Sequence, residues 1–165
     1  MVKQKNQKNK FLYLGLISVA IVLAFFAFKA IDEKTYNLPT NNVNYSNSKT
    51  YTSKTLKFTI TLPPNYEVSE GINALFIRDK TGNEIRITRQ GTNYNALKEY
   101  LISLGSVIAD KTETQINDLP AVIGLINDIK YYFLYVNNSV YSISTSSKAL
   151  FGDLDQIARS FRYTP

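Results

Sequence analysis

One uncharged apolar segment near the amino terminus most restricts what this chain can form. Residues 11–28 read FLYLGLISVAIVLAFFAF, without a charged side chain, and Ala30 and Ile31 continue the segment beyond Lys29. At a helical rise of about 1.5 Å per residue, this run spans about 27 Å, close to the hydrocarbon thickness of a bilayer. A helix satisfies its own backbone hydrogen bonds in lipid, so we predict one transmembrane helix at residues 11–31.

Two alternatives to a membrane anchor are a buried helix of a soluble domain and a cleaved signal peptide. A buried amphipathic helix carries polar residues at helical spacing, whereas the polar side chains here are Ser18 and Tyr13. A signal peptide has an apolar region of about 7–15 residues that ends in an Ala-x-Ala-like site. No pair of alanines in this segment has that spacing, so the sequence favours an uncleaved anchor over a cleaved signal.

The positive charge of the chain is concentrated around this segment. Residues 1–34 hold six lysines against Asp32 and Glu33, which gives +4 of the total formal charge of +6. By the positive-inside rule, the basic tail at residues 1–10 lies in the cytoplasm, and the part after the anchor lies outside the cytoplasm at the cell membrane. Because the rest of the chain is nearly neutral, we expect a lipid bilayer at residues 11–31 and no nucleic acid among the partners.

Two regions follow the anchor. Residues 32–55 are rich in Asn, Ser and Thr and poor in large aliphatic residues, so they are predicted to form a polar linker, with Tyr45 and Tyr51 able to dock its later part on the domain. Residues 56–165 are predicted to form one folded extracytoplasmic domain. Its first strand is indicated by strict alternation from Leu56 to Leu62, ended by Pro63 and Pro64.

Two segments, residues 74–78 and 84–88, are predicted to form a β-hairpin. A turn with Gly82 in the left-handed conformation places Arg78 opposite Glu84. The same register pairs Ile77 with Ile85 and Leu75 with Ile87, so that unlike charges meet and aliphatic side chains meet. An alternative use of this turn, as a set of calcium ligands, is disfavoured because the loop lacks the longer series of an EF-hand; its oxygen-bearing residues are Asp79, Thr81, Asn83 and Glu84.

The second half of the domain predicts a helix, a strand meander and a final helix. Helical spacing marks residues 95–104, with Asn95 as a candidate cap and Gly105 as the end. A polar segment, 110–118, leads to an apolar strand at 119–126, which belongs in the middle of a sheet. Turns at 127–128 and near 137–139 continue it as an antiparallel meander. An amphipathic helix, with Ser146 or Ser147 as its candidate cap, then runs from about residue 148 to 160 and leads into an extended end at 161–163.

This order of elements predicts an α+β domain: an antiparallel sheet with helices on both faces. Several sequence runs also resemble the PsbP-like domains, a superfamily of α-β-α sandwiches. The runs are LKFTITLPPNYEV, ALKEYL, LPAVIGLI with YYFLYVNNSVYSIS, and FGDLDQIARSFRY, which together cover about residues 56–163. The resemblance implies a non-catalytic accessory or binding module; it does not imply a photosystem partner.

The residue inventory removes many kinds of chemistry. The chain has no His and no Cys, so it can form neither a His-based triad nor a Cys nucleophile nor a zinc site of the usual kind. A Ser-Lys dyad is the remaining hydrolytic alternative, with Lys130 and either Ser142 or Ser144 as its candidates. Asp153 and Asp155 are two positions apart on a helix and cannot converge on one water, so we interpret them as a solvated first turn. We predict no catalytic residue, no metal and no cofactor.

The candidate contact residues are Phe76, Arg78, Arg86 and Arg89. An exposed Phe among arginines is typical of an interaction surface. The alternative is that a helix layer covers Phe76 and the arginines are only solvated. We predict a membrane-anchored, extracytoplasmic binding module for a protein or another envelope component. A small-ligand or lipid-binding domain is left open by the aromatic run at 131–135, and a Ser-Lys hydrolase is the least favoured alternative.

Overall fold

The computed structural model describes residues 47–165 of the chain. The predictions for the basic tail, the transmembrane helix at 11–31 and the linker up to residue 46 lie outside the described residues. Within residues 47–165, no helix has both the length and the apolar composition needed to cross a bilayer.

The described residues form ten strands, two α-helices and one short 3-10 helix. In chain order these are β1 (Lys49–Ser53), β2 (Phe58–Leu62), β3 (Glu67–Glu70), β4 (Ala74–Arg78), β5 (Glu84–Gly91), α2 (Leu97–Ser103), β6 (Ala109–Ile116), β7 (Leu119–Ile126), β8 (Ile129–Val136), β9 (Ser139–Thr145), η1 (Lys148–Leu150), α3 (Phe151–Ser160) and β10 (Arg162–Tyr163).

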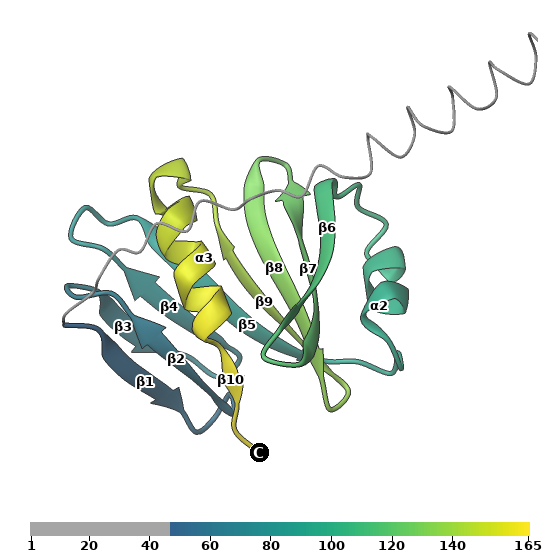
Figure 1. Cartoon of the computed structure of the whole chain (residues 1–165), viewed down its shortest axis with the longest axis horizontal. Helices are drawn as coiled ribbons and strands as arrows, with labels where there is room; N and C mark the ends of the chain where they lie inside the picture. Colours follow the sequence, from purple (N-terminus) through teal and green to yellow (C-terminus); the bar gives the residue numbers. More distant parts are fainter. Residues whose placement is uncertain (1–46) are drawn as a thin grey trace, which may run out of the picture. The chain divides into compact units, whose positions relative to one another are not determined.

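The strands belong to two antiparallel sheets. A three-stranded sheet has the order β1-β2-β10, and a seven-stranded sheet has the order β3-β4-β5-β9-β8-β7-β6. Figure 1 shows the smaller sheet beside the β3–β4 end of the larger one. Antiparallel sheets with two helices confirm the predicted α+β class, although the sequence analysis had predicted a single sheet.

The locally encoded hairpins have the predicted registers. In the β4–β5 hairpin, Arg78 pairs with Glu84 and Ile77 with Ile85, and Gly82 has a φ of 85°. The meander is also confirmed, with its second turn at residues 137 and 138. All four turn residues, Asn127, Asp128, Asn137 and Asn138, have positive φ, which Asn and Asp tolerate better than other side chains.

Three strands, β1, β3 and β6, were missed because all three are polar strands at the edge of a sheet. β1 lies inside residues 32–55, which the sequence analysis assigned to the linker; its pairing with β2 brings residues 49–53 into the folded domain. The Tyr51 hydroxyl docks as anticipated and donates to Glu70 at 2.6 Å. β6 occupies most of the polar segment 110–118, and seven of its eight residues are exposed. Backbone pairing holds such strands without apolar alternation in their sequence.

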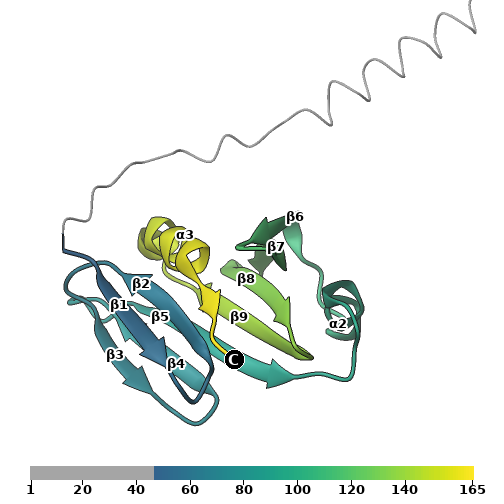
Figure 2. The same ribbon diagram turned by 60° about the horizontal axis from the view of Figure 1, so that its bottom comes forward.

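The two helices contribute to separate cores on opposite faces of the seven-stranded sheet. Adjacent residues of β8 point to opposite faces, and Tyr132 lies in the larger core while Phe133 lies in the smaller one. The larger core also contains Leu154 and Ile157 of α3 and the inner side chains of the three-stranded sheet. The smaller core contains Leu97 and other residues of α2. Figure 2 shows the two helices well apart, with α2 near the β6–β7 edge.

Neither helix uses its predicted side-chain cap. Ala96 is the residue before α2 and makes no side-chain capping bond, while the backbone N–H of Asn95 donates to Glu99. Ser147 precedes η1, also without a capping bond from its side chain. Gly105 has a φ of 62°, as expected for the residue that ends a helix.

We expect Tyr141→Phe to make the stability less sensitive to alkaline pH. The Tyr141 hydroxyl donates to the carbonyl of Leu56 at 2.6 Å, and burial raises the pKa of Tyr141 to about 12. In the unfolded chain the pKa of a Tyr is about 10. The stabilisation that comes from the raised pKa of Tyr141 is therefore complete below that pH and is lost as the pH rises towards 12. The variant should lose about 1–2 kcal/mol at neutral pH. Thermal unfolding at pH 8 and pH 11 measures both effects; an unchanged pH dependence in the variant would contradict this prediction.

Candidate functional site

Side chains from four neighbouring strands form one row across the face of the seven-stranded sheet that also carries α2. Strand pairing places Phe76 of β4 opposite Arg86 of β5, Arg86 opposite Ser144 of β9, and Ser144 opposite Tyr131 of β8. Directly paired residues of antiparallel strands lie on the same face of a sheet. We call Phe76, Arg86, Ser144 and Tyr131 the open row.

The helix layer does not cover the open row. α2 packs on the neighbouring residues Val122, Phe133 and Val140, with which it forms the smaller core. Phe76, Ser144 and Tyr131 are half-buried, and Arg86 is exposed. Of the two alternatives for Phe76, an exposed surface or a face under a helix, the structure therefore supports partial exposure beside the helix.

Phe76 contacts two of the predicted arginines. The guanidinium carbon of Arg86 lies 5.4 Å from the centre of the Phe76 ring, and that of Arg78 lies 5.7 Å from it. Both distances are within the range of a cation–π contact. The structure thus brings together three of the four predicted contact residues.

Arg89, the fourth predicted residue, lies on the opposite face of the sheet. It is three positions from Arg86 on the same strand, and side chains at odd spacing point to opposite faces. Its guanidinium carbon lies 5.9 Å from the ring of Tyr141, which belongs to the larger core. Arg89 therefore cannot act on the same surface as Phe76 and Arg86.

A groove of about 400 Å³ runs beside the open row. Three members of the open row, Arg86, Ser144 and Tyr131, line it. Its other lining residues are Gly82, Asn83, Glu84, Ile129, Thr145, Ser146 and Ser147. The lining is rich in hydroxyl groups, and Arg86 provides its positive charge.

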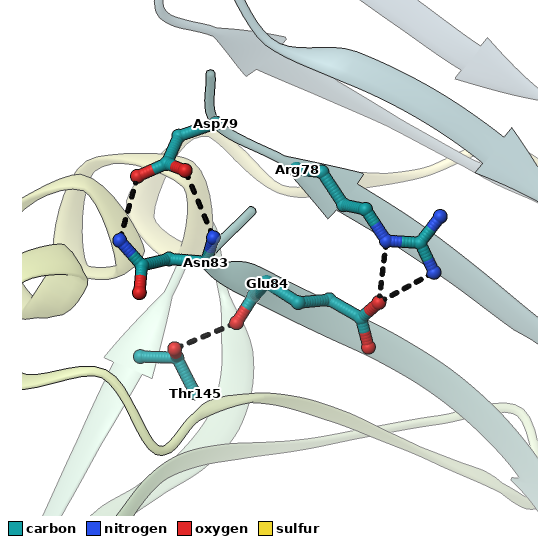
Figure 3. A network of polar contacts seen from close by, with 5 residues as sticks. All are labelled: Arg78, Asp79, Asn83, Glu84 and Thr145. Carbon is teal, nitrogen blue, oxygen red and sulfur yellow. Dashed lines mark hydrogen bonds and ion pairs between the residues drawn. The ribbon is translucent and has the colours of Figure 1, made fainter. Parts of the chain in front are cut away.

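Gly82, Asn83 and Glu84 of the β4–β5 turn line the groove, and Figure 3 shows the polar contacts that hold this turn. One oxygen of Asp79 accepts hydrogen bonds from the backbone N–H groups of Thr81 and Asn83, at 2.8 and 2.9 Å. Its other oxygen accepts from the side-chain amide of Asn83 at 2.9 Å. The hydrogen bond from Asn83 is the largest influence on this carboxyl, and the net result is a lowered pKa for Asp79. Both carboxylate oxygens of Asp79 thus accept hydrogen bonds from residues of the same turn. This agrees with a structural role for Asp79 in the turn and disfavours a role as a calcium ligand.

Both the side-chain carboxylate and the backbone carbonyl of Glu84 have polar partners. Nε and a terminal nitrogen of Arg78 lie 2.9 and 2.7 Å from one carboxylate oxygen, and the hydroxyl of Thr145 donates to the Glu84 carbonyl at 2.7 Å. Figure 3 shows both contacts. Over the described residues, no group of three or more Asp or Glu side chains is arranged to hold a metal ion.

Lys130 does not share a face with the serines proposed as its partners. Its ammonium group lies 2.5 Å from Asp155 of α3, on the side of the larger core. Ser144 lines the groove on the other face, and Ser142 lies 2.6 Å from the Thr88 hydroxyl there. The sheet therefore separates the two halves of the Ser-Lys dyad.

The two acidic side chains of α3, Asp153 and Asp155, accept hydrogen bonds from other side chains of the protein. Asp155 accepts from the Tyr132 hydroxyl at 2.7 Å as well as from Lys130, and Asp153 accepts from Tyr66 at 2.5 Å. Burial is the largest cause of a raised pKa at Tyr132, followed by the charge of Asp155. The expectation of a solvated first turn was wrong, because these side chains face β8 and the segment after β2.

Ser144 was considered only as a nucleophile of a Ser-Lys dyad, and its place in a groove with other hydroxyl groups was not predicted. Alternation along β9 places Ser142 and Ser144 on the face opposite Tyr141 and Ile143, which is a signal that the sequence contains. Their position beside Arg86 depends on the pairing of β5 with β9, in which the paired residues are 48 to 58 positions apart in the sequence. Local patterns do not specify that pairing.

The comparisons with known proteins concern the fold alone. No protein-family model and no curated protein sequence matches the chain. A crystal structure of a protein from Bacteroides thetaiotaomicron VPI-5482 is similar with a TM-score of 0.53 and 10% identity, covering 71% of this chain. The match covers 48% of that protein, so this chain spans about half its length.

A second similar structure is the solution structure of cyanobacterial PsbP (CyanoP) from Synechocystis sp. PCC 6803. Its TM-score is 0.49 at 9% identity, over 74% of this chain and 95% of that one. The chain thus has an α+β fold that it shares with the Bacteroides protein.

Proposed function

We propose that this chain is a membrane-anchored, extracytoplasmic binding module of PsbP-like fold, without catalytic activity, that engages a partner protein through the open row. The observation that carries the proposal is the part of the seven-stranded sheet that α2 leaves uncovered. There the exposed Arg86 contacts the Phe76 ring, and a groove lies beside them. Arg and aromatic residues are enriched where proteins bind one another.

The location of the module is supported by the sequence. The apolar segment at 11–31 would hold the domain at the membrane, and the lysines before it would place the domain outside the cytoplasm. A tether of this kind raises the local concentration of the domain near other membrane proteins. A modest interface is then sufficient for a stable encounter.

Site-specific photo-crosslinking in the native membrane tests this proposal. With a benzophenone amino acid in place of Tyr131, the full-length chain should give a discrete cross-linked protein band. The double substitution Phe76→Ala and Arg86→Gln should reduce that band at least about fivefold, because these changes remove the aromatic and cationic contacts.

The matched control places the same photoreactive group at Tyr94, an exposed tyrosine outside the open row. The Tyr94 position should not give the Tyr131-specific band. Equal bands from both positions, or a band that survives the double substitution, would overturn the proposal.

A further inference from the structure

The groove beside the open row contains a cationic group, Arg86, that forms no ion pair with any residue of the described part of the chain. Three ion pairs are present in residues 47–165, and Arg86 takes part in none of them. Arg78, by contrast, is ion-paired with Glu84 and lies directly opposite Glu67 of β3. Of the two arginines that contact Phe76, Arg86 is therefore the one whose charge is available to a ligand.

The Arg86 guanidinium is positioned rather than freely mobile. Its central carbon lies 5.4 Å from the centre of the Phe76 ring, within the range of a cation–π contact, which restricts the side chain. Its backbone is held on both sides, by β4 and by β9. A ligand that binds Arg86 would thus lose less side-chain freedom than it would at an isolated surface arginine.

Neutral hydrogen-bonding groups surround this cation. Ser144 lies directly opposite Arg86, and Tyr131 lies directly opposite Ser144, with all three on the wall of the same groove. The hydroxyl of Ser142, two residues from Ser144 along β9, already lies 2.6 Å from the Thr88 hydroxyl. Ser144 and Tyr131 make no side-chain hydrogen bond to another described residue, and both line the groove.

We infer that this groove binds a carboxylate of an acidic peptide segment in the partner protein. A guanidinium offers two parallel N–H donors that match the two oxygens of a carboxylate. The groove has one available positive charge, and its lining also contains the Glu84 carboxylate, so it suits a monoanion better than a dianionic phosphate. Phe76 lies next to Arg86, and Tyr131 lies beyond Ser144 on the other side; these two rings provide aromatic contact for the neighbouring residues of the peptide.

This inference rests on the proposed function, because it names the group that the open row would recognise. Binding of two peptides to the full-length chain in detergent tests it: acetyl-Gly-Glu-Trp-Glu-Gly-amide and the same peptide with Gln in place of both Glu. The chain contains no Trp, so the indole anisotropy of the peptide reports binding directly. The Glu peptide should bind at least about tenfold more tightly than the Gln peptide.

Variants of the chain identify the group that makes the difference. Arg86→Gln should bring the affinity for the Glu peptide down to that for the Gln peptide, and Ser144→Ala should weaken it about two- to fivefold. Arg162→Gln removes the same charge from the other sheet and should leave binding unchanged. Thermal unfolding of each variant checks that the fold is intact.

Each contrary result has a defined meaning. Unchanged binding of the Glu peptide by Arg86→Gln, or equal affinity for the Glu and Gln peptides, would overturn the carboxylate inference. Displacement of the Glu peptide by inorganic phosphate at concentrations where acetate has no effect would also overturn it, since the groove would then prefer a dianion. The photo-crosslink at Tyr131 would remain in these cases if the open row binds a partner by other contacts, so failure of the proposed function is recognised separately.

Discussion

Replacing Phe161 with Ala is expected to lower the free energy of unfolding by about 3–5 kcal/mol. Phe161 follows α3 and is fully buried. Its ring centre lies 5.2 Å from that of Phe58 in the three-stranded sheet and 5.0 Å from that of Tyr141 in the seven-stranded sheet. The ring therefore joins both sheets to the end of α3, and its removal leaves a cavity that none of these elements can close alone.

Equilibrium urea unfolding, followed by far-ultraviolet circular dichroism, measures this loss. Phe76→Ala is the matched control, because Phe76 is also a sheet-associated phenylalanine but is only half-buried. It should cost about 1 kcal/mol, in proportion to the smaller apolar area that it removes from water. A loss below about 1 kcal/mol for Phe161→Ala would mean that the two sheets do not depend on this ring.

Asp155→Ala is expected to cost about 2–4 kcal/mol, the second largest effect. The Asp155 carboxylate accepts from Lys130 at 2.5 Å and from the Tyr132 hydroxyl at 2.7 Å. The side chains of Lys130 and Asp155 are only 17% and 22% exposed, respectively. Water would therefore solvate the charged ammonium group of Lys130 poorly after the removal of Asp155. The partial exposure places the expected cost below that of a fully buried pair.

A double-mutant cycle distinguishes loss of the ion pair from loss of packing. Lys130→Met removes the charge that Asp155→Ala would leave unpaired, so the double variant should be more stable than the sum of the two single losses predicts, by about 1–2 kcal/mol. Tyr132→Phe gives the separate contribution of the second hydrogen bond. Strict additivity in the Lys130–Asp155 cycle would contradict an energetic coupling between the two residues.

Local patterns were sufficient for the hairpins but not for the polar edge strands. In the β4–β5 hairpin, the turn geometry and the alternation of Ile77 and Ile85 specify the same register, so the sequence predicted it correctly. β1 and β6 carry mostly polar side chains and are held by backbone hydrogen bonds to β2 and β7. Those bonds do not depend on side-chain identity, which is why composition assigned residues 49–53 to the linker.

Local sequence patterns likewise predicted only a part of the candidate site. Sequence alternation was enough to place Phe76, Arg78 and Arg86 on one face, and it also separates Arg89 from them, although Arg89 was grouped with them because it is near in sequence. The hairpin register predicted the pairing of Arg78 with Glu84, but it did not predict that Arg86 forms no ion pair among the described residues, because the neighbour of Arg86 on its other side comes from the distant strand β9. The structure shows that the ion pair forms with Arg78.

By itself, the sequence determined the α+β class, the hairpin registers and the apolar segment predicted to span the membrane, because each depends on residues close together in the chain. Only the tertiary structure decided that β5 pairs with β9, that α2 leaves the open row uncovered, and that a groove with Arg86 and Ser144 lies there. These features depend on contacts between distant segments, where packing and the pairing of charges select among arrangements that local patterns allow equally.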